Sequence, residues 1–409
     1  MHILYFHQYF STPSGAAGTR SYEAAKALIA RGHRVTMVCG AGMHLKVDGL
    51  QQVRKGERHG IVDGINVIQF ELPYSNRDGF LRRSWTFLWF ALRSVGVLFK
   101  VEYDLVFATS TPLTAAIPGI AAKLSMRGKP FVFEVRDLWP ELPKAMGVIR
   151  NPIVLMAMSC LEWLAYRSAD LCVGLAPGIV EGIRKRGSKS LPVEMIPNSC
   201  DLELFRPDVA AAEMDGIEVG QFVALFTGAH GIANGLDAAL DVAAELKKRR
   251  RDDIRLVFVG DGNRKDALVE RAKACGMDNC VFLDPIPKAM LPRIMARANV
   301  GLMILDDVPA FYNGTSPNKF FDYISSGLPV LINYPGWLAE LVVESECGVS
   351  VVPGDASVFA DALIEMADHR VDLTLMGGQA RLLAETRFSR DVSSSQLIAL
   401  LEELVPIIE

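Results

Sequence analysis

The feature that most constrains the fold of this chain is the alternation of short apolar segments with longer helical ones. In the first half, the apolar segments are rich in β-branched and aromatic residues, and the stretches between them have helical spacing. The predicted strands are 3–6, 34–39, 66–70 (after a polar loop), 105–108, 131–135 and 171–174, and the predicted helices are 21–30, 112–126 and 151–168. This alternation predicts an α/β fold with a mostly parallel sheet and helices on both of its faces.

The second half of the chain repeats this plan. A strand at 222–227 leads into a glycine-bearing turn, GAHGIANG, and a helix begins near Leu236. A second unit follows, in which the strand and turn IRLVFVGDGN precede a helix at 264–275. Because 409 residues are too many for one ordinary domain, we predict two doubly wound, Rossmann-like domains. Their expected bounds are 1–200 and 201–385, with a C-terminal helical segment at 386–409.

The composition and the N-terminus exclude several classes of protein. The net charge is −4, whereas a dedicated nucleic-acid binder needs an excess of basic residues. The first residues, MHILYF, have no basic region or cleavage site, so we expect a first strand and not a signal peptide. No uncharged apolar run reaches the roughly 18 residues of a membrane-spanning helix.

Cysteines and possible metal ligands are scattered. The seven cysteines include no CxxC pair and mostly lie in apolar runs, which favours buried thiols in a reducing cytoplasm. No cluster of Asp, Glu or His has metal-ligand spacing, so we expect no metal cofactor.

The turn after the first strand is rich in glycine but lacks the dinucleotide-binding fingerprint. It reads GAAG where GxGxxG is required, and the second strand ends in Cys39 and Gly40 without a carboxylate for the ribose. These two departures exclude a nicotinamide-dependent oxidoreductase. The flexible backbone at Gly15 and Gly18 can still approach a diphosphate or a sugar, and Arg20 can reach the same anion.

The stretch 313–331, NGTSPNKFFDYISSGLPVL, carries the strongest functional motif. Proline suits the first turn of a helix, so we expect a short helix to begin at about Pro317 and to present its positive end beside Thr315 and Ser316. Lys319 and Asp322 lie three residues apart on one face of that helix. A cation and a carboxylate in this arrangement suit a diphosphate followed by a ribose. The alternative is a capped surface helix with an incidental ion pair.

The pattern SPNKxFxYxxxGxPV resembles the donor-binding signature of the retaining glycosyltransferases of GT-B fold and family 4 type. The resemblance implies two Rossmann-like domains facing each other across a cleft, with a nucleotide sugar bound mainly by the second one. Asp322 corresponds to the second acid of the family's paired-acid motif, which binds the ribose. The first acid is missing because Gly314 stands at its position, which leaves Thr315 or Ser316 as its substitutes, beside Pro317 and Asn318.

Other segments extend the resemblance over nearly the whole chain. VEMIPNSCDLELFRP at 193–207 is similar to the linker between the two domains, and the family's last helix commonly crosses back to the first domain. The family's lysine before the first helix of the second domain is absent, so other cations must balance the diphosphate. The expected donor-binding residues, in addition to those in 313–331, are Gly15, Gly18, Arg20, Gly228, His230, Asn234, Gly260, Gly262, Arg264, Lys265 and, beside a uracil base, Ile286.

FEVRDLWPELPKAMG at 133–147 leaves a predicted strand at its carboxyl end, where open α/β sheets bind ligands. The DLWPE segment is similar to one in bacterial transferases of O-antigen and capsule assembly, some of which move N-acetyl-L-fucosamine from UDP onto a polyprenyl-diphosphate-linked glycan. The resemblance implies that Asp137 lies on the acceptor side and assists deprotonation, and that Arg136 faces an acceptor phosphate. The alternative is an ion pair that stabilises the loop.

Residues 80–101 form the most hydrophobic stretch of the chain. Trp85 and Trp89 share a helical face with other apolar residues, and the basic residues of the stretch include Arg82, Arg83 and Arg93. This combination suits a helix that lies in a membrane interface, and it predicts a cytoplasmic protein bound peripherally to the inner face of the cell membrane. The alternative is a core helix packed on the sheet.

Two rival functions remain at this level. UDP-N-acetylhexosamine 2-epimerases pair similar domains, but they lack the SPNK signature. A non-catalytic subunit that binds a nucleotide or a glycan would explain the missing first acid and the missing lysine.

Overall fold

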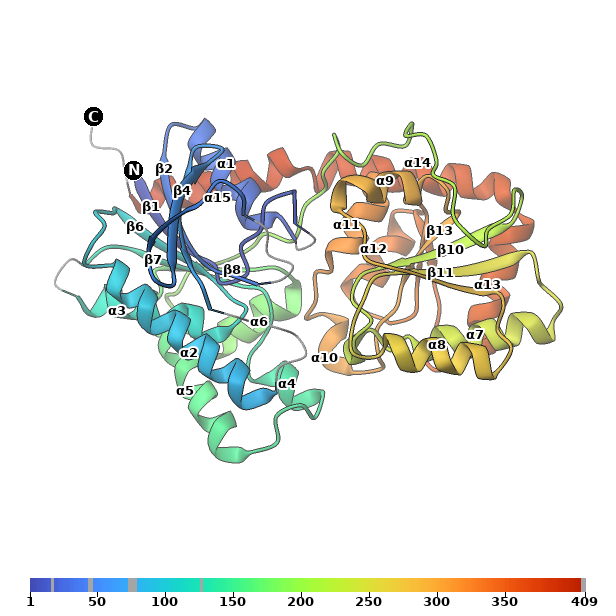
Figure 1. Ribbon diagram of the computed structural model, residues 1–409, viewed down its shortest axis with the longest axis horizontal. Helices are drawn as coiled ribbons and strands as arrows, with labels where there is room; N and C mark the ends of the chain where they lie inside the picture. The colour runs from blue at the N-terminus through green and yellow to red at the C-terminus, as the bar shows by residue number, and fades with distance from the viewer. Residues whose placement is uncertain (16–17, 43–46, 73–78, 126–127, 406–409) are drawn as a thin grey trace. The chain divides into compact units, whose positions relative to one another are not determined.

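A computed structural model describes residues 1–15, 18–42, 47–72, 79–125 and 128–405. The chain forms two compact units (Figure 1). Unit 1 contains Met1–Asn198, Gly314–Ser316 and the chain from Asp391 onward, and unit 2 contains Ser199–Asn313 and Pro317–Arg390. Both units are α/β structures built on mainly parallel sheets, which confirms the predicted fold class.

Unit 1 contains a sheet with the strand order β3-β4-β5-β2-β1-β6-β7-β8-β9. Its strands are β1 (His2–Phe6), β2 (Arg34–Gly40), β3 (Gln51–Arg54), β4 (Glu57–Val62), β5 (Ile65–Phe70), β6 (Leu105–Thr109), β7 (Phe131–Val135), β8 (Leu171–Gly174) and β9 (Val193–Met195). The chain runs from β1 to β2 on one side and enters β6 on the other side. The carboxyl ends of β1, β6 and β7 therefore meet where the strand order reverses, which is where such sheets bind ligands.

The predicted polar loop before β5 is in part a β-ribbon. β3 and β4 pair antiparallel, and β4 pairs antiparallel with β5 at the edge of the otherwise parallel sheet. All four residues of β3 are exposed, so the segment has no alternation of apolar and polar residues that could reveal a strand. The sequence prediction of a loop was wrong at this point.

Helices cover both faces of the unit 1 sheet. The helices are α1 (Arg20–Ala30), α2 (Phe80–Val97), η1 (Leu113–Ala115), α3 (Ala116–Leu124), α4 (Glu141–Ala145), α5 (Pro152–Ser168), α6 (Pro177–Arg186) and α15 (Arg390–Leu404). Figure 1 shows α1 and α15 on one side of the sheet and α2, α3 and α5 on the other. Leu397 and Leu401 of α15 are buried in the same core cluster as Leu28 of α1.

Unit 2 contains an all-parallel sheet with the strand order β12-β11-β10-β13-β14-β15. The strands are β10 (Phe222–Thr227), β11 (Ile254–Val259), β12 (Cys280–Leu283), β13 (Val300–Met303), β14 (Val330–Ile332) and β15 (Gly348–Ser350). The order reverses between β10 and β13, so the turns that follow β10 and β11 lie next to the expected ligand position.

The helices of unit 2 follow the predicted alternation. They are η2 (Ile232–Asn234), α7 (Asp237–Lys248), α8 (Lys265–Ala274), η3 (Lys288–Met290), α9 (Leu291–Met295), α10 (Pro309–Tyr312), α11 (Asn318–Ser325), α12 (Trp337–Glu344), α13 (Ala356–Asp368) and α14 (Arg370–Arg387). Buried residues of α7, α8 and α13 share one hydrophobic core with the strands. α11, the helix of the SPNK motif, contacts β13, β14 and α14.

Candidate functional site

Two glycine turns of unit 2 lie directly against each other at the carboxyl ends of β10 and β11. A Cβ atom at Gly260 would lie 1.9 Å from the carbonyl oxygen of Gly228, and one at Gly262 would lie 2.3 Å from the carbonyl oxygen of His230. No side chain fits at either distance, so the close backbone approach itself requires glycine at both positions. The predicted donor-binding turns thus form one compact backbone surface.

His230 is buried inside this surface and is not a solvent-facing polar contact. Its ring lies among Phe226, Phe258 and Phe282, with ring centroids 6.1–6.4 Å away. Burial lowers the pKa of His230 to about 4, so the imidazole is neutral at physiological pH. Its backbone ties the turns together, because its N–H donates to Asp261 and its carbonyl accepts from the N–H of Arg264. His230 therefore links the two glycine turns through its backbone, and its ring packs in an apolar environment.

Lys319 is the basic residue that stands over these turns. Its Nζ donates to Oδ1 of Asn234 at 3.0 Å and lies 3.7 Å from the centroid of the Phe226 ring. A Cβ at Gly228 would lie 3.4 Å from the same Nζ. Among the described residues no carboxylate lies within ion-pair distance of Lys319, and burial lowers the pKa of its ammonium group to about 7.

Two other cations that the sequence offered for the diphosphate are already paired. Arg264 donates to Asp237 of α7 at 2.7 Å. Lys265 donates to Asp284 at 2.8 Å and to two backbone carbonyl oxygens. Both side chains therefore hold unit 2 together, and of the three basic side chains predicted in this unit Lys319 is the one without a carboxylate.

Asp322 lies one turn of α11 beyond Lys319, but the two do not form the incidental ion pair that was the alternative. Asp322 is 7% exposed, and its Oδ1 lies 3.4 Å from Nζ of Lys288. Burial raises the pKa of the Asp322 carboxyl group, while the charge of Lys288 opposes that shift. Ile286 is partly exposed in the loop between β12 and η3 that also supplies Lys288.

The residues before α11 divide between the two units. Pro317 is the N-cap of α11 in extended conformation and Asn318 begins the helix, one residue later than predicted. Thr315 and Ser316 belong to unit 1. The hydroxyl of Ser316 accepts a hydrogen bond from the backbone N–H of Asn198 at 3.1 Å. This contact joins Ser316 to the last residue of the first segment of unit 1.

Unit 1 has its own candidate site, a cavity of about 230 Å³ lined by His7, Tyr9, Gly18, Thr111, Arg136 and Asp137. These residues follow the carboxyl ends of β1, β6 and β7 or belong to the glycine-rich turn. Oδ2 of Asp137 accepts a hydrogen bond from the hydroxyl of Thr111 at 2.8 Å. Nη1 of Arg136 lies 3.4 Å from Nε2 of His7. Arg136 and Asp137 therefore do not pair with each other, contrary to the alternative of an ion pair that stabilises the loop.

The glycine-rich turn contributes less to this cavity than the sequence predicted. Gly18 lines the cavity, whereas Gly15 is buried and donates its N–H to Thr12; residues 16–17 lie outside the described residues. Arg20 is bound internally by Glu134 at 2.8 Å and by the carbonyl oxygens of Ile196 and Pro197. Burial alone would raise the pKa of Glu134, but Arg20 holds it below its usual value. The sequence predicted Arg20 as an anion ligand. Its guanidinium group instead pairs with the buried carboxylate of Glu134.

The apolar face of α2 points outward. Trp85 is 63% exposed and Trp89 43%, and their rings stack with centroids 6.0 Å apart, whereas Thr86, Phe90 and Ser94 face the interior. This arrangement contradicts the alternative of a core helix for the tryptophan face. Arg82 and Arg83 lie on the first turns of α2.

Arg93 does not belong to the outward face. It donates to Glu57 and to the carbonyl oxygen of Gly56, both at 2.8 Å, and it lies over the ring of Phe70. The prediction of Arg93 as a membrane contact was wrong, because the side chain anchors the β-ribbon to α2.

A second apolar face on α5 was not predicted. Ile153, Met156, Trp163 and Leu164 are each between 43% and 70% exposed. α3 contacts both α2 and α5, and Figure 1 shows the three helices on one side of the unit 1 sheet. The helical spacing of 151–168 was visible in the sequence, but the sequence alone does not show which face is covered.

The structure also bears on metals and membrane spans. Among the described residues no group of three or more His, Cys, Asp and Glu side chains could hold a metal ion. None of the described helices is both long enough and apolar enough to cross a bilayer. The cysteines are free. Cys39, Cys172, Cys200 and Cys347 are buried, as expected, whereas Cys160 and Cys275 are exposed.

The fold of the chain is that of the GT-B glycosyltransferases, with TM-scores of 0.76 to sucrose-phosphate synthase from Thermosynechococcus elongatus (17% identity, 98% of both chains) and 0.69 to WaaG, a glycosyltransferase involved in lipopolysaccharide biosynthesis (15% identity, 99% of this chain and 100% of WaaG). It matches Anabaena HepE in complex with UDP-glucose equally well, with a TM-score of 0.69, 19% identity and coverage of 98% and 100%.

Sequence families give the same class. Residues 15–199 match the family described as glycosyl transferase 4-like domain, and residues 221–369 match glycosyl transferases group 1. The two matches together span most of the chain, which belongs to the group 1 glycosyltransferases of family 4 type.

Individual relatives match less than half of the chain. A D-inositol 3-phosphate glycosyltransferase of Nocardia farcinica is 30% identical over 197 residues, and one of Corynebacterium diphtheriae is 29% identical over 196 residues. These matches take in 46% and 45% of this chain. The chain spans less than half the length of these relatives, namely 42% and 44%.

Proposed function

We propose that this protein transfers a sugar from a UDP-sugar, bound by unit 2, to a polyprenyl-diphosphate-linked glycan, bound by unit 1. The pathway is O-antigen or capsule assembly, N-acetyl-L-fucosamine is a candidate donor sugar, and the reaction proceeds with retention. Membership of the glycosyltransferase family and the DLWPE resemblance support this proposal. The chain's own residues support the assignment of the two substrates, as follows.

The observation that carries the proposal is the environment of Lys319, which has no carboxylate partner among the described residues. Placing a cation in a partly buried site without a carboxylate costs free energy, and a ligand with negative charge removes that cost. Lys319 stands over the turns at Gly228 and Gly260, and α11 begins one residue before it, so its first backbone N–H groups and its positive dipole end face the same region. This set fits the diphosphate of a nucleotide sugar, and it takes over the role of the missing lysine.

Asp322 completes the donor site in this proposal. A buried carboxylate three residues after Lys319 fits the ribose hydroxyls. Lys288, 3.4 Å away, keeps part of its charge compensated when no ligand is bound. During transfer, Lys319 and the helix dipole stabilise the charge that develops on the diphosphate leaving group, which is the kind of electrostatic stabilisation that lowers barriers by several kcal/mol.

Arg136 and Asp137 supply the acceptor side in this proposal. Arg136 has a neutral imidazole beside it and no described carboxylate partner, which suits an acceptor phosphate. Asp137 is fixed by Thr111 and accepts the proton of the attacking hydroxyl or orients that hydroxyl.

The test is UDP release from a panel of UDP-sugars, with and without a polyprenyl-diphosphate-linked sugar. Release that requires one donor and the lipid acceptor supports the proposal and identifies the donor. Protein that binds UDP but releases none from any combination contradicts it. Interconversion of the UDP-sugar without acceptor would favour an epimerase, and binding without turnover would favour a non-catalytic subunit.

We further propose that unit 1 docks on the cytoplasmic face of the cell membrane through the outward faces of α2 and α5. Neither α2 nor α3 has an acidic residue, and Glu162 of α5 is buried against Arg186 at 2.7 Å. Exposed tryptophans, aliphatic side chains and basic residues without exposed carboxylates suit an anionic lipid surface.

Liposome sedimentation tests this docking. The double substitution Trp85→Ser/Trp89→Ser should lower partitioning onto anionic liposomes by about tenfold or more, because it removes two interfacial aromatic rings. A matched control is Val371→Ser/Leu375→Ser, which removes two exposed apolar residues at the same spacing on α14 of unit 2. Equal effects of the two double substitutions would contradict a specific docking face.

A further inference from the structure

His7 lines the unit 1 cavity but has no role in the predicted site. It follows β1 directly, only 2% of the residue is exposed, and its backbone N–H donates to the carbonyl of Val38. A buried imidazole at the carboxyl end of a central strand is costly unless both ring nitrogens have partners.

The tautomer of His7 follows from its neighbour. Nη1 of Arg136 lies 3.4 Å from Nε2 of His7, and a guanidinium group can only donate hydrogen bonds. Nε2 must therefore accept, and in a neutral imidazole the proton then lies on Nδ1. Burial, together with the charge of Arg136, lowers the pKa of His7 well below 6.5, which keeps the ring neutral at physiological pH.

The Nδ1–H group is left without a partner. Nδ1 is buried and makes no hydrogen bond with any described residue. In the same cavity Asp137 uses Oδ2 for Thr111, and its carboxylate keeps capacity to accept another proton donor. His7 and Asp137, which both line the cavity, thus have one unused donor and one unused acceptor, which together match a hydroxyl group, since a hydroxyl both accepts and donates.

We propose that the Nδ1–H of His7 donates to a hydroxyl oxygen of the acceptor sugar, which makes His7 a specificity-determining residue of the acceptor site. This inference rests on the proposed transferase function. Arg136 fixes the tautomer of His7 through Nε2. Asp137 accepts a hydrogen bond from the same sugar hydroxyl group to which His7 donates. A sugar that lacks this hydroxyl leaves the Nδ1–H unpaired and is rejected.

Three substitutions separate the two ring nitrogens. His7→Asn places an amide near the position of Nδ1 and keeps a donor there, His7→Gln places the amide near Nε2 and keeps the contact with Arg136, and His7→Leu removes both. The assay uses the UDP-sugar that is turned over, with prenyl-diphosphate-linked monosaccharides as acceptors. His7→Leu and His7→Gln should raise the acceptor KM about tenfold, with UDP affinity unchanged, and His7→Asn should recover most of the loss.

Other patterns overturn the proposal. If His7→Gln recovers activity and His7→Asn does not, His7 acts only by positioning Arg136. If His7→Leu lowers UDP affinity and thermal stability along with acceptor affinity, its role is purely structural. A wild-type acceptor KM in His7→Leu removes His7 from the site.

A measurement that needs no turnover keeps this inference separate from the proposed function. In ¹⁵N NMR of the full-length protein, the His7 ring should show a protonated Nδ1 and an unprotonated Nε2. The Nδ1 resonance should shift on addition of a prenyl-diphosphate-linked monosaccharide and not on addition of UDP. A protonated Nε2, or an Nδ1 resonance that stays unchanged when that glycolipid is bound, contradicts the proposal even if transfer is observed. If no transfer is observed but the Nδ1 resonance shifts with the glycolipid, the sugar contact stands and the transferase function fails.

Discussion

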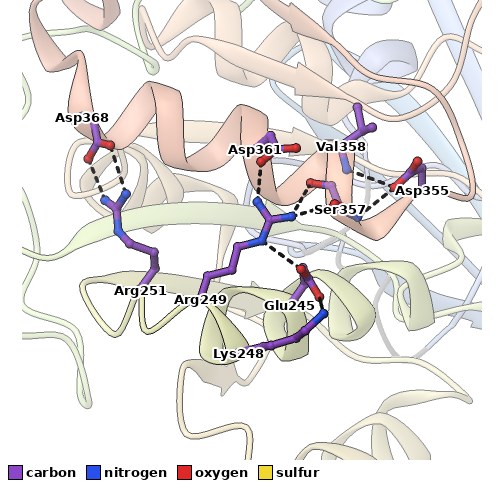
Figure 2. A network of polar contacts seen from close by, with 9 residues as sticks. All are labelled: Glu245, Lys248, Arg249, Arg251, Asp355, Ser357, Val358, Asp361 and Asp368. Atoms are coloured by element: carbon purple, nitrogen blue, oxygen red, sulfur yellow. Dashed lines mark hydrogen bonds and ion pairs between the residues drawn. The ribbon is translucent and has the colours of Figure 1, made fainter.

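Basic side chains in unit 2 lie in two kinds of environment, one with carboxylate partners and one without. Arg249 and Arg251 follow α7 and bind carboxylates of α13 (Figure 2). Arg251 donates to both carboxylate oxygens of Asp368, at 3.1 and 2.9 Å. Arg249 donates to Glu245, Ser357 and Asp361. Lys319, by contrast, has an asparagine and an aromatic ring as its described partners.

The difference separates charges that serve the fold from a charge that awaits a ligand. The hydrogen bonds that Arg249 donates to Glu245 and Asp361 raise the pKa of Arg249, whereas burial lowers the pKa of Lys319 to about 7. Each arginine is thus stabilised in its charged form within the unit itself, while Lys319 gains its full charge only when an anion is present.

The largest effect is expected from Lys319→Gln. It should weaken UDP binding by roughly 3 kcal/mol, or more than a hundredfold, because charge-assisted contacts to both phosphates are lost. The thermal midpoint of the unliganded protein should not fall, because a cation without a counter-charge has been removed. Titration calorimetry with UDP and a thermal melt measure both. Unchanged UDP affinity would place the diphosphate elsewhere.

Asp322→Asn should weaken UDP binding by roughly 1.5–3 kcal/mol, because a charge-assisted hydrogen bond to the ribose is replaced by a neutral one. The same calorimetric titration measures it, with uridine as a second ligand. Uridine binding should weaken by a similar factor if Asp322 holds the ribose, and a loss confined to UDP would assign Asp322 to the diphosphate.

UDP affinity should depend on pH through Lys319. In the unliganded protein Lys319 has a pKa of about 7. A bound diphosphate raises this pKa, so UDP binding takes up a proton above pH 7. Affinity is therefore highest below pH 7 and should be about fivefold weaker at pH 8 than at pH 7, since only the protonated lysine binds well. His230, with a pKa of about 4, does not titrate in this range. Lys319→Gln is the control, and a pH dependence that persists in it would exclude Lys319 as the source.

The smallest effect is expected on the outer network. Arg251→Gln should cost about 1 kcal/mol or less of unfolding free energy, because the pair with Asp368 is partly exposed and screened by water. Denaturant unfolding measures this loss, which should shrink as salt is added. UDP affinity should stay at the wild-type value. A loss of UDP binding in this variant would mean that the network supports the donor site and is not purely structural.

The sequence predicted the alternating elements well because apolar periodicity reflects burial in a sheet. The strands from β1 to β8, apart from β3 and β4, lie where the apolar runs placed them, and so do β10 and β11 in the second half. β3 was not predicted because all its residues are exposed. The sequence left the orientation of the tryptophan face of α2 open, because tryptophans suit a core and a surface equally well.

The candidate sites were predicted less completely than the fold. Lys319 and Asp322 stood out through their spacing, but Lys288 and His7 did not, because their partners lie 34 and 129 residues away in the sequence. Arg20, Arg264 and Lys265 looked equally suitable as anion ligands, since a sequence shows a charge but not its counter-charge.

The sequence by itself determined the fold class, the family and the position of the SPNK helix, because these depend on local periodicity and on short motifs. The tertiary structure decided which cations are already neutralised, that the imidazoles of His7 and His230 are both neutral, and which face of α2 is exposed. Those properties arise from contacts between segments far apart in the chain. Pairing and desolvation act through space, and no local pattern encodes them.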